Sequence, residues 1–167
     1  MKTYPLGVLE KRETEGRKIL PQKGEIMEIA RSPVVTVAPS TPIIDVIRIM
    51  TREGFRRLPV INPATRELEG IVAARDIVDY LGGGRKYEII ETKYDGNFFP
   101  AVYAPVEAIM SKKAVSLRTT GRIGQAINLM IKRGVGGIPV VDRKKRVWAI
   151  VTERDLLHLF SKKLTGK

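Results

Sequence analysis

Two similar stretches decide the fold: GIVAARDIVDYL at residues 70–81 and AIVTERDLLHLF at residues 149–160. Each begins with a short apolar run typical of a strand, continues through an Arg-Asp pair, and ends with the apolar spacing of a helix. A shift of 79 positions superimposes them and pairs Asp76 with Asp155, while Ala73 stands where the second stretch has Thr152. The chain therefore uses one strand-to-helix unit twice, with a difference at the junction.

The repetition extends upstream, because a shift of 80 positions aligns residues 34–61 with residues 114–141. Each copy predicts the order strand–helix–strand–strand–helix, with strands at 34–37, 58–61 and 70–73 in the first copy and at 114–117, 138–141 and 148–151 in the second. Ser40 or Thr41 is expected to cap the first helix, Pro42 to lie in its first turn, and Gly54 to follow its last residue. A unit of about 55 residues is marginally stable alone. We therefore predict an α+β fold in which the two units pack together.

The remaining segments differ in composition from the repeats. We predict an N-terminal extension at 1–25, a first repeat at 26–81, a connector at 82–104, a second repeat at 105–160 and a basic tail at 161–167. The connector opens with three glycines and is rich in aromatic residues. It is expected either to form a hairpin through Asp95-Gly96 or to lie over the core.

Composition excludes several classes of site. The 167 residues include no cysteine and one histidine, His158, so thiolate catalysis, disulfides and His or Cys metal clusters are not expected. No apolar run is long enough for a transmembrane helix, and residues 1–18 do not resemble a secretory signal. These features predict a cytoplasmic protein, and the high charge content suggests a heat-adapted host.

The net charge is strongly positive, at +12 from 30 basic and 18 acidic residues. Such a balance favours polyanionic partners, namely nucleic acid, an anionic membrane surface or phosphorylated ligands. The basic residues are scattered along the chain, however, which is also typical of an ordinary solvated surface.

The order of motifs, with GFRRLPVI before GIVAARDIV and GVGGIPVV before AIVTERDLL, resembles the tandem cystathionine β-synthase (CBS) domain pair, or Bateman module. The resemblance covers residues 26–81 and 105–160. It implies a stand-alone pseudo-twofold module whose two clefts, between the repeats, bind AMP, ADP, ATP or S-adenosylmethionine. It also implies that modules pair into homodimers.

The same resemblance implies the candidate contacts. Asp155 would accept hydrogen bonds from the ribose hydroxyls, since a carboxylate is a strong acceptor, and Thr152 would meet a phosphate beside the amides that open the helix. Thr152 and Asp155 also fit a helix cap that needs no ligand. The other candidates are Asp76 for the second ribose, Arg56, Arg57, Arg75 and Arg154 for phosphates, Val35, Leu58, Val115 and Ile138 for adenine, Gly136 and Gly137 for close backbone approach, and Ser40 or Thr41 reaching the Asp155 cleft from the opposite repeat. The alternative for Arg75 and Arg154 is a salt bridge within the module, and the alternative for the four apolar residues is an ordinary place in the core.

The two clefts are expected to be unequal. Ala73 removes a hydroxyl from the first, whereas Arg56 and Arg57 stand where the second copy has Gly136 and Gly137. Arginine suits phosphate geometry, so the first cleft would rely on cations. Alternatively, the arginines are a solvated pair and the glycines relax a turn.

The sequence contains no dinucleotide fingerprint, no phosphate-binding loop and no Ser/His/Asp set. We therefore expect a non-enzymatic module with no metal and no tightly bound cofactor, which binds an adenosine nucleotide or S-adenosylmethionine reversibly and signals to an effector protein. The alternative is a basic nucleic-acid-binding protein that uses the CBS pair as a scaffold. A third hypothesis is an interaction scaffold whose clefts have degenerated.

Overall fold

The first helix of each repeat forms where apolar residues recur every three or four positions. In the computed structural model, which describes residues 25–166, these helices are α1 (Ile43–Glu53) and α5 (Ile123–Arg133). Both end at a glycine in the left-handed conformation, Gly54 with φ 71° and Gly134 with φ 62°. Because glycine lacks Cβ, it adopts this conformation without steric cost and allows the chain to turn back toward the next strand.

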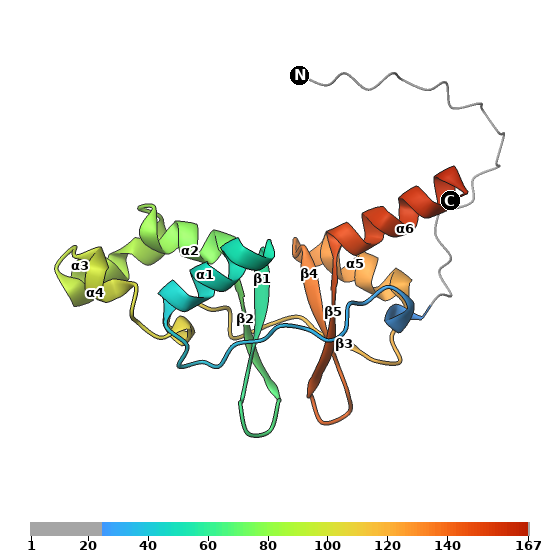
Figure 1. Ribbon diagram of the computed structural model, residues 1–167, viewed down its shortest axis with the longest axis horizontal. Coiled ribbons are helices and arrows are strands. Elements are labelled where there is room, and N and C mark those ends of the chain that lie inside the picture. The colour runs from blue at the N-terminus through green and yellow to red at the C-terminus, as the bar shows by residue number, and fades with distance from the viewer. Residues whose placement is uncertain (1–24, 167) are drawn as a thin grey trace, which may run out of the picture.

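Each repeat then forms an antiparallel hairpin and a closing helix. The elements are β1 (Arg57–Ile61), β2 (Leu68–Ala73) and α2 (Ala74–Leu81) in the first repeat, and β4 (Gly137–Val141), β5 (Val147–Thr152) and α6 (Glu153–Thr165) in the second. Both hairpins contain a register shift at the same repeat position, between Val60 and Ile61 and between Val140 and Val141. Figure 1 shows the two halves side by side, with hairpin turns at one end and α2 and α6 at the other. The predicted α+β architecture of two repeats is confirmed.

The segment that leads into each repeat, residues 25–42 for the first and 105–122 for the second, begins on the opposite repeat. Arg31 exchanges two backbone hydrogen bonds with Ile150 of β5, at 2.8 and 3.1 Å, and Ser111 does the same with Ile71 of β2, at 2.9 and 3.0 Å. The short helices that precede these residues, η1 (Ile26–Glu28) and η3 (Val106–Ala108), fill the cores of the opposite repeats. The two halves therefore share their lead-in segments.

The lead-in segments carry less strand than their composition predicts. In the first, Val37 makes a single bridge to Val60, and in the second only β3 (Leu117–Arg118) pairs, parallel to β4. The predicted strands at 34–37 and 114–117 are therefore largely wrong. Each segment crosses between repeats, so most of its length has no continuous strand edge to pair with.

The predicted cap of α1 is also wrong. Pro42 occupies the N-cap position with an extended backbone, at φ −59° and ψ 141°, and no side chain caps the helix. The Thr41 hydroxyl instead accepts a hydrogen bond from the Ala38 amide at 3.1 Å, which closes a turn upstream of the helix.

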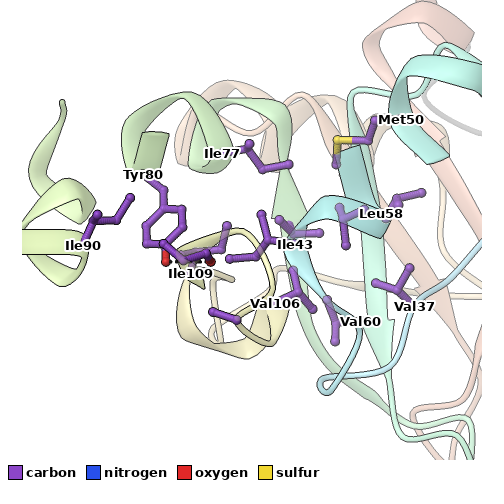
Figure 2. Packing of buried hydrophobic residues seen from close by; sticks show 14 residues of the cluster. Val37, Ile43, Met50, Leu58, Val60, Ile77, Tyr80, Ile90, Val106 and Ile109 are labelled. Carbon is purple, nitrogen blue, oxygen red and sulfur yellow. Dashed lines mark hydrogen bonds between the residues drawn. The ribbon is translucent and has the colours of Figure 1, made fainter. Parts of the chain in front are cut away.

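The connector folds as helices over the first core. It contains η2 (Arg85–Tyr87), α3 (Glu88–Tyr94) and α4 (Phe98–Ala101). The prediction of a hairpin through Asp95-Gly96 is wrong, because Asp95 ends α3 in a left-handed conformation. Tyr80 of α2 and Ile90 of α3 are fully buried, and the Tyr80 hydroxyl donates to the Ala101 carbonyl at 3.0 Å (Figure 2). The connector thus completes the core of the first repeat but not that of the second.

Candidate functional site

The carboxylate of Asp155 lies at the junction of β5 and α6 and is only 6% exposed. Its Oδ2 accepts hydrogen bonds from both the backbone N–H and the hydroxyl of Thr152, each at 2.7 Å. These bonds form because Asp155 is the third residue of α6, within reach of the residue that precedes the helix. Thr152 is therefore engaged with Asp155, and the carboxylate keeps one oxygen, Oδ1, for another partner.

That second oxygen is held by a residue which the sequence did not indicate. Arg31 donates from Nε to Asp155 Oδ1 at 2.6 Å, although the two residues are 124 positions apart. The bridge between Arg31 and Ile150 brings the guanidinium to this end of β5. The Arg31 side chain is 48% exposed, whereas that of Asp155 is 5% exposed, so the guanidinium covers the carboxylate from the solvent side.

The equivalent carboxylate in the first repeat is held by a different cation. Asp76 Oδ2 accepts from the Ala73 amide at 2.7 Å, and Asp76 Oδ1 lies 2.5 Å from Lys86 Nζ. Lys86 also donates to the Ile109 carbonyl at 2.5 Å. Its side chain is 30% exposed, which is less than that of Arg31. Lys86 thus ties Asp76 to two neighbouring segments, and this contact is more enclosed than the pair at Asp155.

The glycine run after α2 explains how Lys86 reaches Asp76. It turns the chain back so that Asp79 accepts the amides of Arg85 and Lys86, at 3.0 and 3.1 Å. A side chain at Gly84 would overlap the Asp79 carboxylate, so only glycine permits this approach. In the second repeat the position equivalent to Asp79 is His158, which is exposed.

Arg57 lies between the repeats. Its Nη1 donates to the Gly136 carbonyl at 2.6 Å, and a Cβ at Gly136 or Gly137 would collide with its side chain. Burial lowers the pKa of Arg57, while Glu153 acts in the opposite direction and Arg56 adds to the lowering. In the repeat, Arg57 corresponds to Gly137, and Arg56 corresponds to Gly136. The absence of side chains at the two glycines leaves the space that the Arg57 side chain occupies.

The remaining predicted residues differ in burial and do not form one cluster around Asp155. Leu58 and Ile138 are almost fully buried in separate cores, and Val35 is 41% exposed. Val115 is half-buried. Five of the predicted polar or charged residues are at least partly exposed: Arg56, Arg75, Arg154, Ser40 and Thr41. Among the described residues, none of these arginines forms an ion pair. Their side chains are free to meet an anion.

A hollow of about 340 Å³ opens beside Asp155. Its lining is Glu28, Ile29, Asp155, His158, Leu159 and Lys162, contributed by η1 and α6. The hollow therefore uses a lead-in segment from one repeat and the closing helix of the other. Within residues 25–166, no group of three or more His, Cys, Asp or Glu side chains is placed to hold a metal ion, and no helix in this range has the length and apolar character needed to cross a membrane.

Comparison with known proteins identifies relatives of the whole two-repeat unit. A family model described as CBS domain matches residues 26–83 and 106–162. The chain is 36% identical over 140 residues to the uncharacterized protein MJ1225 of Methanocaldococcus jannaschii. The crystal structure of MJ1225 superimposes with a TM-score of 0.80, over 83% of this chain and 50% of that one. This chain therefore spans about half the length of that relative.

Two solved structures share the fold at lower identity. The CBS domain pair of protein MJ0100, in complex with 5′-methylthioadenosine and S-adenosyl-L-methionine, has a TM-score of 0.68 at 23% identity and covers 83% of this chain and 97% of that one. CBSX2 in complex with AMP has a TM-score of 0.67 at 20% identity, with the same two coverages. These likenesses concern the fold, in which both repeats and their order are preserved.

Proposed function

We propose that this chain, which belongs to the CBS domain family, is a regulatory module that binds an adenosine-containing ligand at Asp155. The observation that carries the proposal is the Asp155 carboxylate, which is buried, oriented by Thr152, and closed only by an exposed arginine. A carboxylate fixed in this way accepts two neighbouring hydroxyls, as a ribose presents them. The adenosyl ligands bound by the CBS pairs of MJ0100 and by CBSX2 support the choice of ligand class.

A ligand at this position requires Arg31 to leave Asp155 Oδ1. Its guanidinium remains nearby because its backbone is bridged to β5. Arg154 is exposed on the first turn of α6, whose amides also favour an anion. Phosphate groups would meet these cations, whereas the positive sulfonium of S-adenosylmethionine would be repelled by them. We therefore favour AMP, ADP or ATP as the ligand, with S-adenosylmethionine as the alternative.

We further propose that only the Asp155 cleft binds. Lys86 neutralises Asp76, is less exposed than Arg31, and is also bonded to the Ile109 carbonyl. Displacing it would break two hydrogen bonds to a charged donor, each of which contributes about 1.5–3 kcal/mol. Ala73 also provides no hydroxyl at this junction. One ligand per chain is the expected stoichiometry.

The proposal is tested by calorimetric titration of ligand-stripped protein with AMP, ADP, ATP and S-adenosylmethionine. Asp155→Asn retains an oxygen that accepts the Thr152 amide but loses the charge, so it should fold and lose binding. Asp76→Asn is the matched control and should bind as the wild type does. Thermal melting of both variants shows whether they are folded. Saturable heat with none of the four ligands would contradict the proposed function, and two ligands per chain would contradict the single cleft.

The module is also proposed to pair with a second copy through α2 and α6. Val78 and Leu157 occupy equivalent positions on these helices and are 68% and 63% exposed, an unfavourable arrangement for apolar side chains in water. Figure 1 shows both helices along one edge of the molecule. The double variant Val78→Glu with Leu157→Glu should sediment as a monomer where the wild type sediments as a dimer. In such a dimer, ligand binding at Asp155 would change how the two copies pair and thereby change the surface that an effector protein contacts.

A further inference from the structure

The turns of the two hairpins form a basic surface at the end of the molecule remote from α2 and α6 (Figure 1). They are joined by hydrogen bonds from the Leu68 amide to the Lys145 carbonyl, at 3.0 Å, and from the Val147 amide to the Arg66 carbonyl, at 3.1 Å. The joined turns carry five cations and two acidic residues: Arg66, Arg143, Lys144, Lys145 and Arg146 against Glu67 and Asp142. We call these residues, together with Trp148, the hairpin-tip surface.

A hollow of about 420 Å³ lies on this surface. It is lined by Ser32, Pro33 and Val34 of the first lead-in segment and by Arg66, Arg146 and Trp148 of the two hairpins. Trp148 is the only tryptophan of the chain, and it is 53% exposed. The hollow thus combines an accessible aromatic ring with arginines from both repeats.

Trp148 is held in place by hydrogen bonds at its polar atoms. Its Nε1 donates to Asp142 Oδ2 at 3.1 Å, and the Ser32 hydroxyl donates to its carbonyl at 3.1 Å. Asp142 Oδ2 also accepts from Arg146 Nε at 2.7 Å. Desolvation acts to raise the pKa of Asp142, but hydrogen bonds from Trp148, Arg146 and the Lys144 amide hold it well below the ordinary value. The carboxylate therefore stays ionised and fixes the indole at neutral pH.

The charge of the surface is not cancelled by this carboxylate. Asp142 is engaged with Arg146 and with backbone amides, so Arg66, Arg143, Lys144 and Lys145 have no ion pair among the described residues. Arg146 keeps both terminal nitrogens of its guanidinium, because only Nε is bonded to Asp142.

Two of the cations stand where the backbone favours glycine. Arg66 and Lys145 occupy equivalent turn positions with φ 65° and φ 61°. Side chains rarely adopt this left-handed conformation, and glycine or asparagine would fit with less strain. The left-handed conformation therefore does not by itself select a cation at either position.

We propose that the hairpin-tip surface binds single-stranded nucleic acid, with a base stacked on Trp148 and the flanking phosphates on the cations of both turns. Stacking on an accessible indole requires an unpaired base, and a track of basic residues follows the phosphates on either side. An acidic protein segment would match the charge but would leave the indole unused. Asp155 does not line this hollow, so the proposal does not rest on the proposed adenosyl ligand.

The intrinsic fluorescence of Trp148 reports the site directly. Full-length protein is titrated with an unstructured 15-nucleotide oligouridylate, and saturable quenching is expected, with an affinity that falls steeply between 50 and 200 mM salt, as for phosphate contacts in general. Arg143→Glu with Lys144→Glu should weaken binding by at least ten-fold. The matched control, Arg133→Glu with Lys163→Glu, makes the same change of charge at exposed positions in the last turns of α5 and α6 and should weaken binding less than three-fold.

Two further variants separate binding from folding. Lys145→Gly should bind less tightly while its melting temperature stays equal or rises, because the strain at φ 61° is relieved. Trp148→Ala, followed by anisotropy of a labelled oligouridylate, should lose about ten-fold in affinity, as expected for the loss of one stacked base. The proposal is overturned if no saturable binding occurs, if the control double variant loses as much affinity as the tip variant, or if Trp148 fluorescence does not change on binding. Quenching by heparin equal to that by oligouridylate would also overturn it, since heparin has no base to stack.

Discussion

Replacement of Lys86 by methionine should destabilise the protein far more than removal of a typical surface cation. Lys86 Nζ lies 2.5 Å from both Asp76 Oδ1 and the Ile109 carbonyl, and thereby connects α2, the connector and the second lead-in segment. Methionine keeps the apolar stem and removes only the charge, so packing changes little. The variant therefore isolates the polar contribution of the side chain.

The magnitude follows from the two hydrogen bonds. A bond that involves a charged group contributes about 1.5–3 kcal/mol, and the exposure of the two side chains, 30% for Lys86 and 22% for Asp76, reduces this through solvent screening. We expect a loss of about 2 kcal/mol in the free energy of unfolding. For a protein of this size, that loss lowers Tm by about 4–8 °C.

Differential scanning calorimetry and urea unfolding at pH 7 measure the change. Arg48→Met is the matched control, because Arg48 pairs with Asp45 at 2.9 Å while the side chains are 68% and 45% exposed. That variant should change stability by less than about 0.5 kcal/mol. Equal losses of Tm in the two variants would show that Lys86 is solvated in the native protein and would contradict the proposal that no ligand binds at Asp76.

Three other predictions follow from the contacts described above. Tyr80→Phe leaves the Ala101 carbonyl with only the Ala104 amide as donor, at 3.2 Å, and should cost about 1 kcal/mol, measured by urea unfolding; an unchanged midpoint would show that the Tyr80 hydroxyl does not stabilise the connector. Gly137→Val should collide with Arg57 and cost about 2 kcal/mol, and Arg57→Ala in the same chain should recover part of the loss in a double-mutant cycle. Because the folded-state pKa of Asp142 is depressed, its stabilisation is present above the ordinary Asp pKa and is lost as pH falls through the folded value. Asp142→Asn should therefore lower the unfolding free energy at pH 6 and have a smaller effect at pH 2.5, whereas equal effects at both pH values would contradict the pKa assignment.

The repeat and the order of its helices and hairpins could be predicted because they depend on local pattern. The apolar positions of α1, such as Ile43, Val46 and Met50, recur at helical spacing and are buried as that spacing predicts. Gly54 and Gly134 end their helices because the left-handed conformation is a property of the residue itself. The cap of α1 was predicted wrongly because the first two amides of the helix donate to the Ala104 and Val102 carbonyls, at 2.9 and 2.8 Å, and these contacts across the chain are not encoded in the local pattern.

The candidate carboxylates could also be found from the sequence, but their partners could not. Asp76 and Asp155 have the same position in the repeat and bond the same neighbouring amide, so local pattern treats them alike. Their second oxygens differ because Lys86 comes from the connector, which folds back after three glycines, and Arg31 comes from the lead-in segment of the other repeat.

The sequence by itself determined that two equivalent units exist, where their helices and hairpins lie, and which two carboxylates begin the closing helices. Only the tertiary structure decided which cation neutralises each carboxylate, that Arg57 packs against Gly136, and that the two basic turns meet beside Trp148. The physical reason is sequence separation. A contact such as Arg31 with Asp155, 124 positions apart, depends on the packing of the lead-in segment across both repeats, and no periodicity along the chain encodes that crossing.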